Sequence, residues 1–598
     1  MRLFPSLIIS KQRRNIVDEY KDPVLEQMKS IAPNIQKERE MIVRARTQGI
    51  GALFKSFVRL SGPGWLQSAI TLGGGSLSSS MYLGVLVGFG LLWLQPLAMI
   101  AGIIMLSAIS YVTLSTGRRP VRTINEFVSP VLGWSWLLAS MLANLVWSMP
   151  QYSLAIASFQ QNLLPQIFGP PTVEPFTGKV LAGLVVLGIN IIFLILYTLG
   201  GRGVKTFEII VKLMVASVVV CFFGVVAVLT ITGQVQWQKY LAGFIPDFSL
   251  LFRPSRDLIP YIEQVPETFR SYWTNLIVSQ QRDVIISAAA TAVGINMTFM
   301  LPYSMLRKGW DREFRGLAIF DLSTGLFFPF ILATSCVVIA SATQFHAKPA
   351  PGFLGERDEK GNIIQPAPNL VGSFQKLIEG RVIYEIGEQA WNALSKEAKE
   401  EKIKSLPEID RKLSAMMVRR DAFNLSDALK PLTGSTVARY VFGIGVLGMG
   451  LGTSTMLMLI NSLCLCELLN RPLRGWTQFF GGLMVSLSLV GVLFWKDAQM
   501  WLAIPTSLFC MTLLPLAYLS FWLLLNQKKL LKDDSPQGYK WWLWNILLFV
   551  SFTLSAFGAV WSITSRVGFK GIWIIVAFLA LVIVVHIIRK MRSKAVSV

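Results

Sequence analysis

Apolar runs long enough to cross a lipid bilayer recur along most of the chain. We count about twelve of them, near residues 55–86, 90–115, 131–161, 177–199, 204–232, 284–307, 313–343, 435–468, 475–496, 498–526, 540–565 and 569–589. A helix of about 20 apolar residues spans the roughly 30 Å of bilayer hydrocarbon, so each run predicts one membrane-crossing helix. The pattern therefore predicts an all-α, multi-pass integral membrane protein.

Polar stretches divide this series of spans into segments. We expect a cytoplasmic amphipathic N-terminal segment (1–54), a first set of five spans (55–232), an extracytoplasmic loop (233–283), a second set of five spans (284–526) that carries an extracytoplasmic insertion (345–433), and two last spans with a cytoplasmic tail (527–598). Glu and Lys spaced i,i+4 in the insertion predict solvated helices. These helices form either a structural cap or a surface for a lid or a partner.

Lysine and arginine cluster in alternate connections, such as GRRPVR at 117–122, RKGWDREFRG at 307–316 and RKMRSK at 589–594. The short connections between them are poor in both residues, which is the positive-inside pattern and predicts that both termini are cytoplasmic. The formal net charge of +22 is then a consequence of topology. We expect membrane lipid around the chain and no nucleic-acid partner, in a plasma (inner) membrane of the bacterial type.

The composition excludes several classes of function. The chain is 53% hydrophobic and 15% charged, whereas soluble domains carry about 25% charged residues. Its five cysteines and two histidines show no metal-binding or disulfide spacing, and no phosphate-binding loop is present. We therefore expect no enzymatic activity, no cofactor and no ATP-driven pump.

The first span is interrupted in its middle by TLGGGSLSSSMYLG, residues 71–84. Glycine costs about 1 kcal/mol relative to alanine inside a helix. Irregular backbone persists in hydrocarbon only where protein buries it or where it lines a cavity. For this span alone, a flexible kink or a close helix crossing explains the glycines equally well.

A second interruption favours transport over a kink. The sixth span, VIISAAATAVGINMTFMLPYSML, carries Gly294, Asn296 and Thr298 near its midpoint and Pro302 in its second half. Interrupted helices at matching positions of two five-span halves are typical of inverted-repeat transporters, which bind substrate at the midplane. An ion channel or a scramblase could also carry broken helices, but the paired placement favours a LeuT/APC-type fold that works by alternating access.

The substrate is expected between the two breaks, where unwound carbonyls and half-helix ends supply partial charges. The candidate substrate-binding residues, which also form the candidate metal site, come from span 1 in and before its break and from the middle of span 6. They are Gln67, Gly73, Gly74, Gly75, Ser76, Gly294, Asn296, Met297 and Thr298.

Polar side chains elsewhere in the spans are candidates for a coupling-ion site: Thr453, Ser454, Thr455, Lys212, Glu208 and Asp321. The three hydroxyls of span 8 match in kind the second sodium site of LeuT-type proteins, or they serve helix packing. Lys212 either pairs with Glu208, four residues earlier, or points toward spans 1 and 8 in place of sodium. Asp321, less than two turns after Arg315, either is a snorkelling or paired carboxylate or relays protons.

These motifs resemble the Nramp family of divalent-metal transporters. Gly62-Pro63-Gly64, the break at 73–76 and the run GFGLLW at 88–93 match the spacing of that family's pattern GPG…DPGN…GxxLLW. GLGTSTMLMLINSL at 450–463 is similar to its GQSSTM segment, and GRGVKTFE places Glu208 on its glutamate. The resemblance implies an inverted repeat of spans 1–5 and 6–10, with broken helices 1 and 6.

The family's metal ligands are not retained. The Asp and Asn of Asp-Pro-Gly-Asn correspond to Gly73 and Ser76, and span 6 has no Met-Pro-His in register, although Met297 and Met300 lie close by. A dehydrated transition metal requires stronger ligands than hydroxyls, amides and carbonyls. We therefore expect a weakly coordinated or hydrated divalent cation. The alternatives are an ion-coupled transporter of a small polar organic solute such as an amino acid, and a non-transporting sensor whose partner contacts 345–433.

Overall fold

The computed structural model describes residues 35–169, 172–199, 202–358, 360–434, 436–473, 475–494 and 499–595. Most of the expected N-terminal segment, residues 1–34, lies outside the described residues. The described part is helical, and its extended backbone pairing is limited to one isolated β-bridge between Arg357 and Ile363.

Eleven helical segments in the described ranges are long and apolar enough to cross a membrane. They are built from α6 (Leu94–Thr116), α8 (Pro130–Ala157), α10 (Pro175–Leu199), α11 (Arg202–Ile231), α14 (Glu267–Ala292) with α15 (Ile295–Arg307), α16 (Arg315–Gly325) with α17 (Phe327–Phe345), α23 (Phe442–Leu468), α24 (Trp476–Leu483) with α25 (Ser488–Phe494), α26 (Ala503–Leu525), α28 (Tyr539–Val567) and α29 (Lys570–Ala595). The broken pair α4 (Pro63–Thr71) and α5 (Gly74–Val87) adds one more crossing. The prediction of about twelve spans is confirmed.

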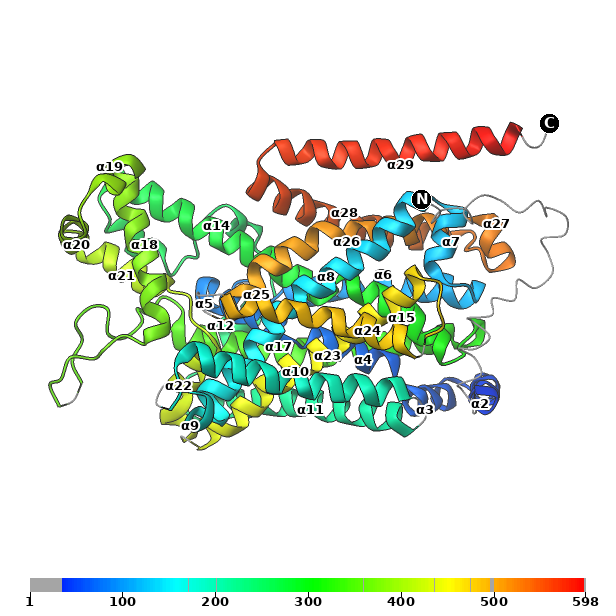
Figure 1. The fold of residues 1–598 in the computed structure, drawn as a ribbon, viewed down its shortest axis with the longest axis horizontal. Helices are drawn as coiled ribbons and strands as arrows, with labels where there is room; N and C mark the ends of the chain where they lie inside the picture. The colour runs from blue at the N-terminus through cyan, green and yellow to red at the C-terminus, as the bar shows by residue number, and fades with distance from the viewer. Residues whose placement is uncertain are drawn as a thin grey trace.

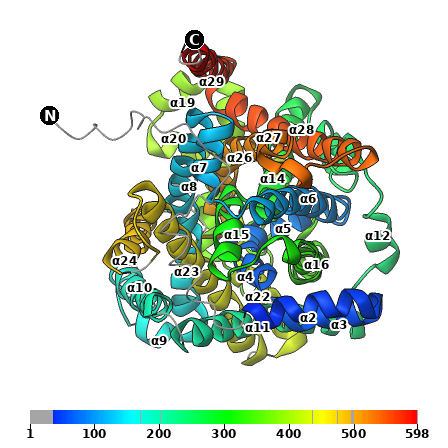
Figure 2. The same ribbon diagram turned by 90° about the vertical axis from the view of Figure 1, so that its right-hand side faces the viewer.

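The broken helices occupy the centre of the bundle. Viewed along the bundle, α4, α5 and α15 lie near the middle, and α8, α23, α11 and α16 surround them (Figure 2). By contrast, α29 runs along the outside of the bundle (Figure 1), and only 6% of its apolar stretch is buried. The side chains of the central helices therefore pack against protein on all sides, whereas α29 presents its apolar surface to lipid.

The first span begins later than the hydropathy suggested. Residues 50–60 form a separate amphipathic helix, α3 (Ile50–Leu60), which follows α2 (Ile35–Gln48). The chain turns at Ser61 and Gly62 because Pro63 has no N–H and disfavours helical backbone in the residue before it. The membrane-crossing part of span 1 therefore starts at Pro63.

The insertion forms a small helical unit at one end of the molecule. It contains α18 (Pro368–Ile386), α19 (Glu388–Ala393), α20 (Lys396–Lys404), α21 (Glu408–Met417) and α22 (Ala422–Thr433). Buried Ile378, Val382, Trp391 and Leu406 give it a core of its own. We call this end of the molecule the insertion side; the opposite end, with α2, α7 (Pro120–Phe127) and α27 (Lys528–Leu531), is the basic side (Figure 1).

The insertion is bonded to the insertion-side halves of both broken spans. The Trp273 indole N–H of α14 donates to the Asp410 carboxylate at 2.6 Å, and Arg381 pairs with the same carboxylate at 3.2 Å. The Tyr82 hydroxyl of α5 donates to the Arg420 carbonyl oxygen. The helix α14 begins at Glu267, well before the expected start of span 6 at residue 284, and this extension carries the contact with the insertion.

Candidate functional site

Both predicted breaks are present, and each is two residues long. Span 1 is helical to Thr71 and resumes at Gly74, and span 6 is helical to Ala292 and resumes at Ile295. Gly73 and Gly294 precede the second half-helices with extended backbone, at ψ −173° and 163°. The two junctions bring a helix C-terminus and a helix N-terminus together at each break, which concentrates partial charges there.

Side chains from neighbouring helices and from span 1 itself satisfy the freed backbone groups of span 1. The Thr453 hydroxyl of α23 donates to the Ala69 carbonyl oxygen at 2.9 Å, and the Ser76 hydroxyl donates to the Thr71 carbonyl oxygen. The Gly74 N–H donates to the Gln151 side-chain oxygen of α8 at 2.8 Å. In a membrane these bonds replace the water that a soluble protein would use at such a break.

The span 6 break touches span 1 through a thioether. The Thr71 hydroxyl has two acceptors within hydrogen-bond distance, the Met297 sulfur at 3.2 Å and the Ala292 carbonyl oxygen at 3.4 Å. The Asn296 side-chain oxygen accepts the Met297 N–H at 2.9 Å, while the Thr298 hydroxyl accepts the Trp136 indole N–H at 3.1 Å. Met297 therefore faces span 1, whereas Thr298 faces α8.

A small void of about 10 Å³ lies beside this junction. It is lined by Ile70, Ala143, Trp147, Ala290, Thr291, Gly294, Ile295, Asn296, Met297 and Cys510. Such a volume holds about one water molecule. Among the expected substrate residues, Gly294, Asn296 and Met297 line this void.

The glycines of span 1 are packed tightly and do not line the void. A Cβ at Gly73 would lie 2.3 Å from the Thr453 hydroxyl oxygen, and one at Gly75 would lie 2.4 Å from the Trp147 ring. These two glycines allow α23 and α8 to approach the break closely. Gly73, Gly74, Gly75 and Ser76 thus shape the break, and the void is bordered by span 6, α8, α26 and, from span 1, Ile70.

Gln67 lies four residues before Thr71 on α4, so the two share a helix face. It is fully buried, and both polar atoms of its amide group lack a hydrogen-bond partner among the described residues. Leaving both groups unpaired in a buried position costs free energy. Gln67 does not line the void, and its role in substrate binding stays a prediction.

Among the lining residues that the sequence analysis did not name, two carry a thiol or a hydroxyl. Cys510 of α26 brings a thiol to the void, and Thr291 of α14 brings a hydroxyl. A cysteine within an apolar run predicts packing, and nothing in span 10 indicated that it faces the break. Cys510 and Met297 together place two sulfur-containing side chains on the lining.

The three hydroxyls of span 8 separate into two groups. Only Thr453 contacts span 1. Ser454 donates to the Asn190 side-chain oxygen at 3.2 Å and Thr455 to the same atom at 2.8 Å. Since Asn190 lies on α10, the last two hydroxyls join spans 4 and 8 rather than forming a site with span 1.

Asp321 caps the basic-side end of span 1. Its buried carboxylate accepts the N–H groups of Gly62 at 3.0 Å and Gly64 at 2.5 Å and the Ser61 hydroxyl. A carboxylate at a helix N-terminus is stabilised by the free N–H groups and the helix dipole. The expected pair with Arg315 is wrong, because Arg315 pairs with Asp534 at 3.0 Å.

Glu208 and Lys212 do not form the expected pair. Glu208 lies 3.9 Å from Lys308, at the end of α15, and Lys212 is exposed on the surface of α11. The alternative in which Lys212 points toward spans 1 and 8 is therefore wrong as well. An outward position costs Lys212 less free energy than a position inside the bundle, because its long side chain can extend toward the membrane–water interface.

A buried ion pair closes the basic side between α7 and α23. Arg119 lies 3.0 Å from Glu467, with 1% and 2% of their side chains exposed, and donates to Asn470 at 3.0 Å. The pair of Lys308 and Glu208 joins the end of α15 to α11. The basic-side ends of spans 5, 6 and 8 are thus held by polar contacts in this conformation.

Two broken helices that meet at a central void within a bundle of about twelve spans are the arrangement found in transporters of the inverted-repeat class. The family model described as natural resistance-associated macrophage protein-like matches residues 64–355 and 413–562. The chain belongs to the Nramp family, and the resemblance seen in the sequence is confirmed. Membership indicates a transporter rather than an enzyme.

Individual relatives are distant. Metal transporter Nramp6.2 of Populus trichocarpa is 27% identical over 172 residues, which span 29% of this chain and 29% of that protein. Solved structures of the Eremococcus coleocola manganese transporter show the same fold. A point mutant of that transporter matches with a TM-score of 0.59 at 13% identity, over 89% of this chain and 95% of that one. The complex of that transporter with an aromatic bis-isothiourea substituted compound matches with a TM-score of 0.58 at 13% identity. This match covers 90% of this chain and 96% of that one.

Proposed function

We propose that the protein is a secondary transporter that carries a divalent cation by alternating access, with the ion bound at the midplane void between the two breaks. The observation that supports this most directly is the junction of Thr71 and Met297 beside a void of ion size. Both termini are cytoplasmic in this proposal, because the basic connections lie on the same side as α2.

The donors around the void suit a weakly held ion. Met297 supplies a thioether, Asn296 an amide and Cys510 a thiol, and the described lining contains no carboxylate or imidazole. A divalent charge in a low-dielectric site is stabilised poorly by neutral groups, so the ion retains part of its water. The two sulfur-containing side chains favour borderline and soft metals over Mg²⁺ among the ions that enter.

The small void implies that binding requires movement. It has room for about one water or one bare ion, so a hydrated ion enters only after a half-helix moves away from Met297. Opening toward the basic side has to separate Arg119 from Glu467 and to shift the Asp321 cap. Polar contacts at one end and a small central site are the arrangement that alternating access requires.

The alternatives receive less support from this geometry. Pockets for organic ligands commonly measure about 300–1,000 Å³, far more than the void between the breaks. Transport of an amino acid would thus need a larger rearrangement. A sensor that responds to a partner at the insertion would use the bonds of Trp273 and Tyr82 to that unit.

Uptake of Mn²⁺, Cd²⁺ and Mg²⁺ into liposomes containing the purified protein tests the proposal. Met297→Ala is expected to reduce Mn²⁺ and Cd²⁺ uptake about tenfold and Mg²⁺ uptake less. Met300→Ala, a buried methionine of the same helix that is absent from the lining, is the matched control. If none of the three ions binds or moves at millimolar concentration, the cation proposal is wrong; uptake of a labelled amino acid would support the organic-solute alternative.

A further inference from the structure

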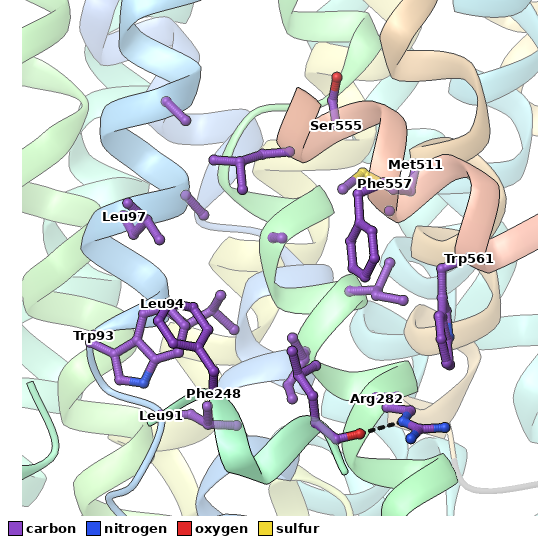
Figure 3. A pocket seen from close by; sticks show the side chains of 18 of the residues that line it. Leu91, Trp93, Leu94, Leu97, Phe248, Arg282, Met511, Ser555, Phe557 and Trp561 are labelled. Atoms are coloured by element: carbon purple, nitrogen blue, oxygen red, sulfur yellow. Dashed lines mark hydrogen bonds between the residues drawn. The ribbon is translucent and has the colours of Figure 1, made fainter. Parts of the chain in front are cut away.

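A larger cavity of about 330 Å³ lies outside the central site, between α6, α14, α26 and α28 (Figure 3). Apolar side chains from all four helices line it, including Leu94, Leu97, Ile285, Met511, Leu554 and Phe557. Apolar cavities of this kind do not hold ordered water, because water finds no polar partners there. The cavity therefore suits an apolar occupant rather than water.

The mouth of the cavity faces the surroundings of the membrane spans. Leu97 of α6 is 39% exposed, and Leu554 and Phe557 of α28 are 41% and 56% exposed. In a membrane, such apolar side chains lie against lipid chains. The cavity is thus open to bilayer hydrocarbon rather than to water.

Arg282 marks the depth of the cavity in the bilayer. It lies ten residues before Ala292, the last residue of α14 before the break, which corresponds to about 15 Å along the helix. Half of the hydrocarbon thickness is also about 15 Å. With the break at the midplane, Arg282 therefore lies at the level where lipid phosphates begin.

Aromatic rings fix Arg282 at this level. Its guanidinium lies 4.8 Å from the centre of the Trp561 ring and 5.5 Å from that of Phe252, and it donates to the Leu251 carbonyl oxygen. Figure 3 shows Arg282 at one end of the cavity beside Trp561, with Ser555 at the other end. Tryptophan is common at the boundary between hydrocarbon and head groups.

Arg282 has no ion-pair partner among the described residues, although the Asp247 carboxylate also lines the cavity. Asp247 pairs with Arg256 at 4.0 Å and Asp283 with Arg566 at 3.1 Å. Across the ranges that the structure describes, no carboxylate lies within ion-pair distance of Arg282. The Arg282 guanidinium therefore lies at one end of the apolar cavity (Figure 3), at the depth expected for lipid phosphates.

We propose that this cavity is a phospholipid site, which takes one acyl chain from the insertion-side leaflet while Arg282 binds the lipid phosphate. Apolar volume and unmatched positive charge occur together, in the order in which a phospholipid presents chain and phosphate. Because α14 is the insertion-side half of broken span 6, the bound chain packs against a helix of the transport core. The lipid then acts as a structural ligand of span 6 in the conformation described.

Photolabelling of the full-length protein in lipid nanodiscs tests the proposal. The probe is phosphatidylglycerol with a diazirine in one acyl chain, and labelled peptides are mapped by mass spectrometry. We expect preferential labelling of peptides from α6, α14 and α28. Ala289→Phe and Ala101→Phe, which fill the cavity from two different walls, are expected to reduce this labelling about tenfold, whereas Leu184→Phe on the exposed face of α10 leaves it unchanged.

The phosphate contact is tested separately. Arg282→Gln is expected to reduce labelling by the phosphatidylglycerol probe about tenfold, and labelling by a diacylglycerol probe with the same chain is expected to stay the same. Lys404→Gln, at an exposed side chain of the insertion, is the control. Equal labelling of all lipid-facing helices, or labelling that persists in both cavity-filling variants, would overturn the proposed lipid site. If Arg282→Gln reduced labelling by the two probes equally, the proposed phosphate contact would be wrong. Each variant is first required to elute as a monodisperse protein, and Arg282→Gln tests the site even if a filling variant fails to fold.

Discussion

The hydroxyl group of Thr71 donates a hydrogen bond to the sulfur of Met297 across 3.2 Å. This contact joins the end of α4 to the beginning of α15, and so links the two breaks through an atom that can bind metal. A cation that uses this sulfur competes with the hydroxyl for it.

Removal of the Thr71 hydroxyl should therefore strengthen the binding of soft metals. In Thr71→Ala the sulfur has no competing donor, and we expect affinity for Cd²⁺ to rise about two- to tenfold, the value of one modest hydrogen bond. Isothermal titration calorimetry in detergent measures this. Ser454→Ala, which removes a hydroxyl bonded to Asn190, is the control, and a weaker rather than tighter Cd²⁺ complex in Thr71→Ala would argue against a role for Met297.

Restoring the family's aspartate at Gly73 should fail unless space is made for it. The new Cβ would lie 2.3 Å from the Thr453 hydroxyl oxygen, and crowding of this kind costs about 1–3 kcal/mol. We expect Gly73→Asp alone to lower the apparent unfolding midpoint without improving Mn²⁺ binding. The double variant Gly73→Asp with Thr453→Gly should recover part of the midpoint and bind Mn²⁺ more tightly than the parent; no gain in the double variant would mean that the residue does not face the ion.

The carboxylate of Asp321 should matter for stability through its acceptor oxygens. Asp321→Ala removes the acceptors of the Gly62 and Gly64 N–H groups and is expected to cost about 1–2 kcal/mol, whereas Asp321→Asn retains one acceptor and costs less. Thermal unfolding in detergent gives this order. Equal loss in both variants would show that charge, rather than hydrogen bonding, holds the end of α4.

Asp257 should make the loop contact with His346 sensitive to acid. The His346 Nε2 atom lies 3.2 Å from the Asp257 carboxylate, and Nδ1 lies 3.0 Å from the Val85 carbonyl oxygen of α5. The contact with His346 holds the pKa of Asp257 below its ordinary value of about 4. Folding is therefore stabilised above that ordinary pKa, and the contribution is lost as the pH falls through the lowered one.

Thermal unfolding measured at pH 5 and at pH 3 tests the direction of this pH dependence. The two pH values lie on either side of the ordinary pKa of about 4. Between these values the wild type should lose more of its apparent unfolding midpoint than Asp257→Asn, which lacks the titrating group from the start. Asp427→Asn, at an exposed position of the insertion, should behave like the wild type. A steeper loss in Asp257→Asn than in the wild type would contradict the assigned direction.

The spans, both breaks and the family could be predicted because they depend on periodicity, length and helix propensity, which the sequence carries directly. The facing of side chains within the central helices could not. Helices α5 and α23 are buried on nearly all sides, so their apolar residues do not mark one face. This is why Thr453 could not be distinguished from Ser454. Cys510 lies on α26, which is apolar on all its faces, so the sequence did not mark the face toward the void either.

Asp321 and Lys212 illustrate the same limit for charged residues. Sequence spacing suggested local partners for both, but the carboxylate of Asp321 is bound by backbone groups about 260 residues away in the chain and Lys212 faces outward. Long-range packing determines the partner of Asp321 and the orientation of Lys212, and the spacing of residues within one helix carries no information about such packing.

The bonds of the insertion to Trp273 and Tyr82 have a practical consequence. One water-exposed unit is tied to the outer ends of both interrupted helices, so a soluble reagent that immobilises it, such as an antibody fragment, would act on the membrane core from outside the hydrocarbon. The insertion is therefore a water-accessible surface through which a single conformation could be stabilised. The broken helices themselves are reachable only within the bilayer.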